Sequence, residues 1–139
     1  MAETNLRFLN PSTIAKPHGY THVIEVLGPG RTVYIAGQLG LTRDGKLAGG
    51  DFRAQAKQAF ANLKNALAAV GAGFEHVVKL NNYLIDIRAN LPIYREVRDA
   101  CLGTANPPPA STAVEVSNLA VPGALYEVEA IAVLPELIV

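Results

Sequence analysis

Three glutamates near the C-terminal end of the chain, Glu115, Glu127 and Glu129, have the residue type and spacing that best suit chemistry. They lie in two segments, 111–118 and 125–134, whose β-branched and aliphatic residues predict strands. A proline-glycine turn separates the segments, so we expect the strands to pair as an antiparallel hairpin. A carboxylate in a mostly buried strand is costly unless it is paired or used. These glutamates are therefore the first candidates for a functional site.

The alternation of side chains along a strand predicts how these carboxylates group. In the predicted hairpin Glu115 shares a face with Ser111, and Glu127 shares a face with Glu129, so pairing clusters all four side chains. One carboxylate could then bond a ligand or position a water as general base. The alternative is a structural set of glutamates that bond the backbone or an arginine across a subunit contact. Spacing alone favours this alternative, because ion-pair networks collect charges in the same way.

Other polar side chains carry weaker signals. Tyr20 could present its hydroxyl to a pocket, and an ordinary packed tyrosine is the alternative. Arg98 lies one turn beyond Tyr94 on a predicted helix and could pair a substrate carboxylate with both arms of its guanidinium. The sequence favours a surface or interface arginine at this position. The histidines lack metal-ligand spacing, so we predict no metal site.

Length and composition limit the class of protein. The 139 residues predict a single domain, 1–139, and half of them are hydrophobic. The 12 basic and 12 acidic residues balance, which argues against a nucleic-acid partner. The polar N-terminus and the lack of an apolar run of roughly 20 residues predict neither a signal peptide nor a membrane span. We therefore expect a cytoplasmic protein, and the single cysteine fits a reducing compartment.

The predicted elements follow the order β-β-α-β-α-β-β, with a short additional strand in front. In chain order they span residues 6–9, 21–27, 32–36, 52–70, 77–87, 91–102, 111–118 and 125–134. A Gly-Pro-Gly turn predicts that the strands 21–27 and 32–36 form a hairpin. Asp51 is expected to cap the first helix, and Pro92 to stand in the first turn of the second.

This order predicts an α+β sandwich, in which one sheet carries two helices on one face. No further helix is predicted to cover the other face. A second subunit is therefore the expected cover, and the large aliphatic content of the chain also favours association.

Several segments together form a familiar pattern. They are Gly37-Gln38 after a strand, the helix around Gln55-Ala56-Lys57-Gln58, the strand Val77-Val78-Lys79, the Pro-Pro-Ala-Ser-Thr-Ala-Val-Glu-Val segment and the Glu-Val-Glu-Ala-Ile-Ala-Val segment. These segments resemble the Rid/YjgF family, also called L-PSP or endoribonuclease L-PSP. The resemblance covers the chain from about Tyr20 to Leu134. It implies a chorismate-mutase-like α+β fold and a homotrimer with ligand sites in the clefts between subunits. It also implies cofactor-free hydrolysis of enamines and imines to keto acids and ammonia.

One position departs from the family pattern at the place where substrate binds. In the best-known members, the arginine of a Pro-Ala-Arg-Ser motif clamps the substrate carboxylate, and this position is Ser111 here. A serine cannot supply a bidentate, permanently charged contact. Loss of the arginine contact should weaken binding of a 2-imino acid by roughly 1.5–3 kcal/mol. We therefore expect weak hydrolysis of 2-iminopropanoate. Leu91 is a second departure, where an asparagine is frequent, whereas Tyr20 and Glu127 match positions that line the family site.

The combined hypothesis is a trimer that binds a small molecule in an intersubunit cleft and hydrolyses an enamine, imine or related C–N bond. Backbone groups near Gly37 and Gln38 and the Ser111 hydroxyl orient the ligand, Glu127 positions the attacking water, and Tyr20 closes the cleft. No metal or organic cofactor is expected, because an imine carbon is already electrophilic. The alternatives are a non-catalytic small-molecule sensor on the same fold and, less favoured, an RNA-cleaving protein.

Overall fold

The computed structural model shows a four-stranded mixed sheet that carries two helices, and a separate two-stranded sheet. It describes residues 4–103 and 107–137, so both ends of the predicted 1–139 domain lie outside the described residues. The elements are β1 (Leu6–Leu9), β2 (Val23–Val26), β3 (Gly30–Leu39), α1 (Phe52–Ala68), the 3-10 helix η1 (Phe74–His76), β4 (Val77–Leu84), α2 (Ile87–Leu102), β5 (Ala110–Glu115) and β6 (Tyr126–Pro135).

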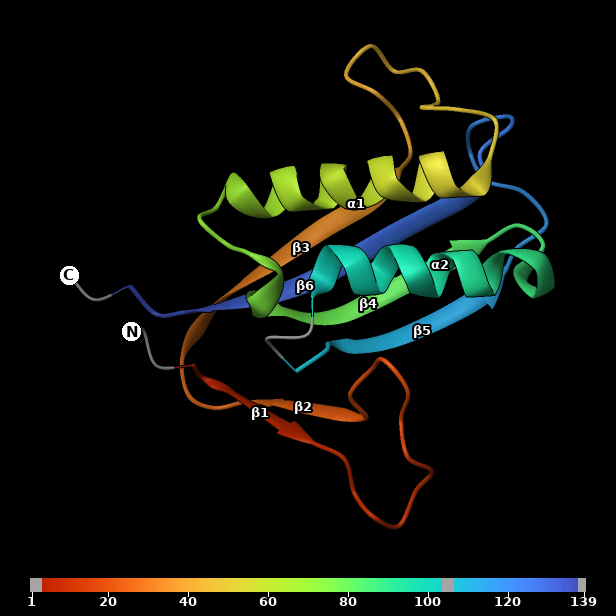
Figure 1. Cartoon of the computed structure of the whole chain (residues 1–139). Helices are drawn as coiled ribbons and strands as arrows, with labels where there is room; N and C mark the ends of the chain where they lie inside the picture. Colours follow the sequence, from red (N-terminus) through yellow and green to blue (C-terminus); the bar gives the residue numbers. More distant parts are fainter. Residues whose placement is uncertain (1–3, 104–106, 138–139) are drawn as a thin grey trace.

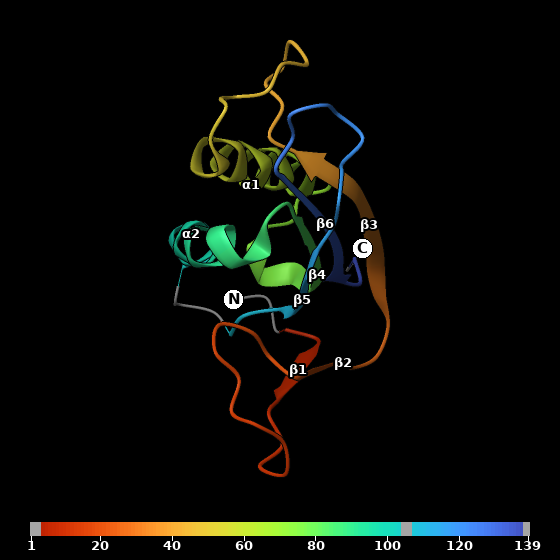
Figure 2. The same ribbon diagram turned by 90° about the vertical axis from the view of Figure 1, so that its right-hand side faces the viewer.

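Both helices cover the same face of the four-stranded sheet. Figure 1 shows α1 and α2 side by side across the strands, and Figure 2 shows them as a layer of their own on one side of the sheet. The buried core lies between these two layers and includes Phe60, Leu63, Leu80 and Tyr126. The predicted α+β architecture, with two helices on one face, is confirmed.

Helix α1 forms where capping and periodicity predict it. The Asp51 carboxylate accepts a hydrogen bond from the Ala54 backbone N–H at 3.1 Å, which satisfies a group that the first turn leaves free. The apolar positions then recur on one face and are buried: Phe52, Ala56, Ala59, Phe60, Leu63 and Leu67. Neither α1 nor any other helix in the described ranges is long and apolar enough to cross a membrane.

The last two strands do not form the predicted hairpin. The sheet order is β3-β6-β4-β5, so β4 lies between them. β5 runs parallel to β4 at the edge of the sheet, and β6 is antiparallel to both β3 and β4. The cause is the α2 crossover, which returns the chain in the direction of β4 and places β5 beside it. The connection after β5 then carries the chain past β4 to its other side.

The predicted hairpin of strands 21–27 and 32–36 is also wrong. β2 pairs antiparallel with β1, from Leu6 opposite Val26 to Leu9 opposite Val23. β3 pairs instead with β6 in the main sheet. Gly28, with φ +75°, and the proline after it direct the chain from one sheet into the other, so the turn signal marks a change of sheet.

Helix α2 begins one turn earlier than predicted. The strand predicted over 77–87 ends at Leu84, and the helix begins at Ile87. The Glu115 carboxylate, at the end of β5, accepts the Ile87 backbone N–H at 3.1 Å and so supplies a cap that Asp86 does not. Pro92 consequently lies inside the helix and not in its first turn.

Candidate functional site

The register of the sheet separates the predicted site residues onto two faces. Leu80 of β4 is fully buried beneath the helices, and it pairs with Ser111 of β5. Tyr83, three residues further along β4, pairs with Glu127 of β6. Because paired residues share a face and residues an odd number apart do not, Ser111 faces the helices and Glu127 faces the opposite side. The predicted clustering of three glutamates with Ser111 is therefore wrong.

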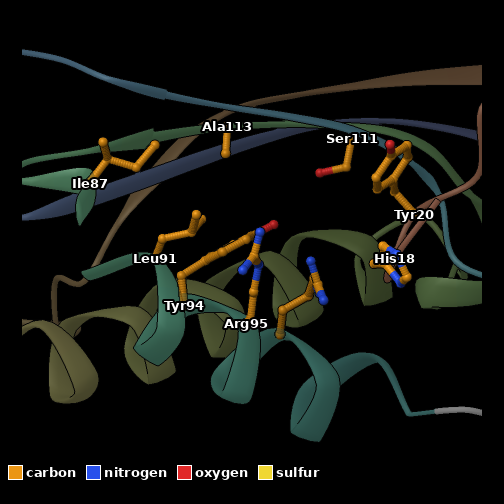
Figure 3. A pocket seen from close by; sticks show the side chains of 9 residues that line it. His18, Tyr20, Ile87, Leu91, Tyr94, Arg95, Ser111 and Ala113 are labelled. Carbon is orange, nitrogen blue, oxygen red and sulfur yellow. The ribbon is translucent and has the colours of Figure 1, made fainter. Parts of the chain in front are cut away.

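A pocket of about 210 Å³ lies on the helix side, between α2, β5 and the loop before β2. We call it the helix-side pocket, and its lining residues are His18, Tyr20, Ile87, Leu91, Tyr94, Arg95, Arg98, Ser111 and Ala113. Figure 3 shows Ser111 and Ala113 reaching in from the sheet, opposite side chains that rise from α2. The pocket brings together three residues predicted for the site: Tyr20, Arg98 and Ser111.

Sequence reasoning did not assign Tyr94, Arg95 or His18 to a site. Tyr94 and Arg95 share one face of α2 with Leu91 and Arg98, because the four recur at intervals of three and four. That periodicity could have shown that Arg95 accompanies Arg98. Nothing in the sequence signals His18, because the loop that carries it has no periodic pattern.

Arg98 is buried within the chain, so it is not a surface arginine, which is one of the two positions that the sequence favours. The other position, at an interface, stays a prediction. Only 7% of Arg98 is exposed. Its Nε donates to the Asp99 carboxylate at 2.9 Å, and its guanidinium carbon lies 5.4 Å from the centre of the Tyr94 ring. A Cβ atom on Gly19 would overlap the Arg98 guanidinium, so the glycine in the preceding loop leaves the space that the guanidinium occupies. Helix α2 and the loop that carries Gly19 together hold the Arg98 guanidinium against the pocket.

A buried chain of hydrogen bonds fixes Ser111. The Tyr126 hydroxyl donates to Asn82 Oδ1 at 2.6 Å, and Asn82 Nδ2 donates to Ser111 Oγ at 3.0 Å. Burial raises the pKa of Tyr126 well above its usual value, which keeps this hydroxyl a donor. Since Ser111 Oγ accepts from Asn82, the hydroxyl keeps its own hydrogen for an acceptor in the pocket.

Tyr94 places a second hydroxyl beside Ser111. Its side chain is 2% exposed, and its buried oxygen has no hydrogen-bond partner within the described ranges. Burial raises the pKa of Tyr94 above its usual value, and the nearby Ser111 and Arg98 offset only part of that rise. A buried polar atom without a partner is costly, so this hydroxyl is suited to meet a ligand.

The other face of the sheet carries Glu127 beside a bulge in β3, a pair we call the bulge site. The pairing of β3 with β6 shifts between Ile35 and Gln38, so Ala36 and Gly37 form the bulge. A Cβ atom at Gly37 would overlap the Glu127 carboxylate, so a glycine is required for this approach. Gln38 turns back and donates to the Ala36 carbonyl at 3.1 Å.

The other two glutamates have structural partners. Glu129 accepts the Tyr83 hydroxyl at 2.6 Å and the Asn81 amide at 3.3 Å, and Glu115 caps α2. Glu127 accepts no hydrogen bond from residues 4–103 and 107–137. Of the three carboxylates it alone is therefore left to act on a ligand or water. Within the same ranges, no group of three or more His, Cys, Asp or Glu side chains is placed to hold a metal ion.

The helix-side pocket and the bulge site cannot act on one ligand within one chain, since the sheet separates them. A ligand that touches both would need a second copy of the chain, with its open sheet face against the helix-side pocket of the first. The open face offers apolar surface for such a contact, since Tyr34 is 79% and Val114 42% exposed.

A family model and individual known proteins both match this chain over most of its length. The family model described as "Endoribonuclease L-PSP" matches residues 11–134. A RutC family protein of Pyrococcus abyssi is 36% identical over 119 residues, which are 84% of this chain and 88% of its own. A 2-iminobutanoate/2-iminopropanoate deaminase of Dermatophagoides farinae is 32% identical over 130 residues, covering 92% and 96% of the two chains.

Solved structures show the same similarity. The Rid-family protein YyfB of Yersinia pestis, described as of unknown function, superposes with a TM-score of 0.87 at 38% identity over 94% of this chain and 100% of its own. RidA of the Antarctic bacterium Psychrobacter sp. PAMC 21119 superposes with a TM-score of 0.67 at 36% identity, over 85% and 90% of the two chains.

Proposed function

Because this chain belongs to the Rid/YjgF family, also described as endoribonuclease L-PSP, we propose that it hydrolyses an enamine, imine or related C–N bond without a cofactor. The observation that carries the proposal is the Glu127 carboxylate, held against the Gly37 bulge while the neighbouring glutamates have structural partners. Relatives named 2-iminobutanoate/2-iminopropanoate deaminase, 32–37% identical to this chain, support the same chemistry.

The proposed assembly is a homotrimer with one site in each intersubunit cleft. The open sheet face of one subunit packs beside the helix-side pocket of the next, so that Glu127 and Gly37 face Tyr20, Ser111 and Arg98 across the contact. The separation of these residues onto two faces of the sheet supports this arrangement. The apolar side chains exposed on the open face support it as well.

In the proposed reaction Glu127 is the general base. It takes a proton from water as the water oxygen bonds to the imine carbon, and the C=N electron pair moves to nitrogen. The same carboxyl returns that proton to nitrogen, which gives a carbinolamine. The carboxylate then takes the hydroxyl proton as the C=O bond forms and delivers it to nitrogen as the C–N bond breaks, so that ammonia and a carbonyl compound leave. Backbone groups of Gly37 and Gln38 and the Ser111 hydroxyl orient the ligand, and Tyr20 covers the cleft.

The test is the variant Glu127→Gln, with imines generated in situ by an amino-acid oxidase. Glutamine keeps the shape but is not a usable base, so turnover should fall by about 10²–10⁴-fold. Glu129→Gln is the matched control, two positions along the same strand and face, and it should keep near wild-type turnover. Both variants should sediment at three times the 14.7 kDa chain mass. Wild-type turnover in Glu127→Gln, or a monomeric wild-type protein, would overturn the proposal.

A non-catalytic binding protein on the same fold is the second candidate. The observation that favours it is Ser111, which stands where the best-known relatives are expected to carry the carboxylate-binding arginine. Such a protein would bind a small acid in the cleft and leave every imine tested unhydrolysed. RNA cleavage is disfavoured by the balance of 12 basic and 12 acidic residues, which offers little attraction for phosphates.

A further inference from the structure

We propose that the helix-side pocket binds the carboxylate of a 2-imino acid through Arg98 and Tyr94 of α2, and that its apolar end selects a branched aliphatic side chain. This inference rests on the proposed function, since it names the side chains that bind the substrate carboxylate in the same cleft. It moves the carboxylate-binding group from the strand, where Ser111 stands, to the facing helix.

The first argument is the incomplete pairing of Arg98. The guanidinium is almost fully buried, yet its one ion pair uses Nε and an Asp99 side chain that is 62% exposed. No hydrogen bond within the described ranges uses its two terminal nitrogens. A buried charge is costly unless it is well paired, and a carboxylate can accept from both arms of a guanidinium at once.

The second argument is that other donors converge on the same place. The buried Tyr94 hydroxyl lacks a partner within the described residues, and Ser111 has a hydrogen to donate. Within residues 4–103 and 107–137, the charged side chains that line the pocket are Arg95 and Arg98, and no Asp or Glu belongs to the lining. Among the described residues, the carboxylate bonded to Arg98 is that of Asp99, which lies outside the lining and takes the Nε hydrogen. Several donors around basic side chains are typical of an anion site.

The third argument is the apolar end of the pocket. Figure 3 shows His18, Tyr20 and Ser111 at one end, and Ile87 and Leu91 towards the other with Ala113 between them. A cavity of about 210 Å³ holds roughly seven water volumes of ~30 Å³ each, so room remains beside a carboxylate for a side chain of several carbons. Burying that side chain against Ile87 and Leu91 gives the selectivity.

The experiment measures binding by titration calorimetry, apart from any turnover. The ligands are 4-methyl-2-oxopentanoate, pyruvate and the uncharged 4-methylpentan-2-one. Wild-type protein should bind 4-methyl-2-oxopentanoate about tenfold more tightly than pyruvate, because more carbon is buried. The ketone without a carboxylate should show no saturable binding. Equal binding of acid and ketone, or no binding of the acid, would overturn the proposal.

Variants of Arg98 test the carboxylate contact directly. Arg98→Met keeps the length of the stem, and it should weaken binding of the acid by about 10–100-fold. Arg88→Met, an exposed position on the same helix and outside the pocket, is the matched control and should bind as wild type. If Arg98→Met fails to assemble, Arg98→Lys keeps the charge without the two-armed geometry and should bind about tenfold more weakly. Wild-type affinity in whichever Arg98 variant assembles contradicts the two-armed contact.

The Glu127→Gln variant separates this inference from the proposed function. It should bind 4-methyl-2-oxopentanoate with near wild-type affinity although it no longer hydrolyses imines. Binding without turnover in the wild type would refute hydrolysis and leave the acid site standing. Turnover in the wild type, together with binding that does not depend on Arg98, would support hydrolysis and refute the acid site.

Discussion

The helix-side pocket and the bulge site lie on opposite faces of one sheet and are built in different ways. In the pocket, buried side chains hold one another: Tyr126 fixes Asn82, and Asn82 fixes Ser111. In the bulge site, an irregularity of the backbone makes room for Glu127, whose carboxylate has no hydrogen-bond partner within the described residues. Recognition of a ligand benefits from a rigid set of donors, whereas proton transfer needs a carboxylate that is not already engaged.

The largest effect that tests this difference is expected from Gly37→Ala. The new Cβ overlaps the Glu127 carboxylate, which is the end of a flexible side chain, so the side chain should move aside and the fold should remain. Turnover should then fall by about 10²-fold, at the low end of general-base loss, because the base is displaced and not removed. Rate measurements under saturating substrate and a thermal melt check both parts.

Gly50→Ala is the control for that experiment, since a Cβ there meets no atom of the described residues within 4 Å. It should leave turnover unchanged. If Gly37→Ala also turns over at the wild-type rate, the position of Glu127 against the bulge is not the position in which it works, and the contrast between the two regions fails.

A smaller effect, on selectivity, is expected from Leu91→Ala at the apolar end of the helix-side pocket. The truncation removes contact with the side chain of the ligand and leaves Arg98 and Tyr94 in place. The preference for 4-methyl-2-oxopentanoate over pyruvate should drop from about tenfold to about twofold, because less carbon is buried. Calorimetric titration of both acids gives the ratio, and an unchanged ratio would show that the side chain lies elsewhere.

Local signals in the sequence predicted the elements, and long-range pairing decided where they meet. Asp51 and the apolar spacing after it predicted α1 to within two residues of its end, because a cap and a helical period are read from neighbours in the chain. The parallel pairing of β5 with β4 depends on how α2 packs, and no short segment encodes it. The expected clustering of glutamates failed for that reason.

The structure brings some of the predicted site residues together and separates others. Tyr20, Ser111 and Arg98 do meet in one pocket, and Gly37 does lie against Glu127, but the two sets lie on opposite faces. The face of a strand residue follows from its register, which slips by one residue at a bulge. The burial of Arg98 was equally hidden, because it depends on the loop around Gly19, far away in sequence.

The smallest expected effect concerns alkaline pH and two tyrosines on opposite faces of the sheet. The pKa of Tyr126 is raised mainly by burial among the helices, and the pKa of Tyr83 mainly by its hydrogen bond to Glu129. In both cases the folded protein favours the neutral phenol. The stabilisation is therefore fully present below the unfolded pKa of about 10 and is lost as pH rises through the folded value.

Unfolding by urea, measured from pH 8 to pH 11, should show stability falling above about pH 10 in the wild type. Tyr83→Phe should reduce the steepness of that fall slightly and leave stability at pH 8 close to wild type, since Glu129 keeps the Asn81 amide as a donor. Tyr126→Phe should reduce the steepness more, and it should also lower stability at pH 8 by about 1–3 kcal/mol because Asn82 loses its buried donor. Equal losses at pH 8 in the two variants would mean that the helix-side network is no more rigidly built than the open face, and the distinction between the two regions would then rest on the bulge alone.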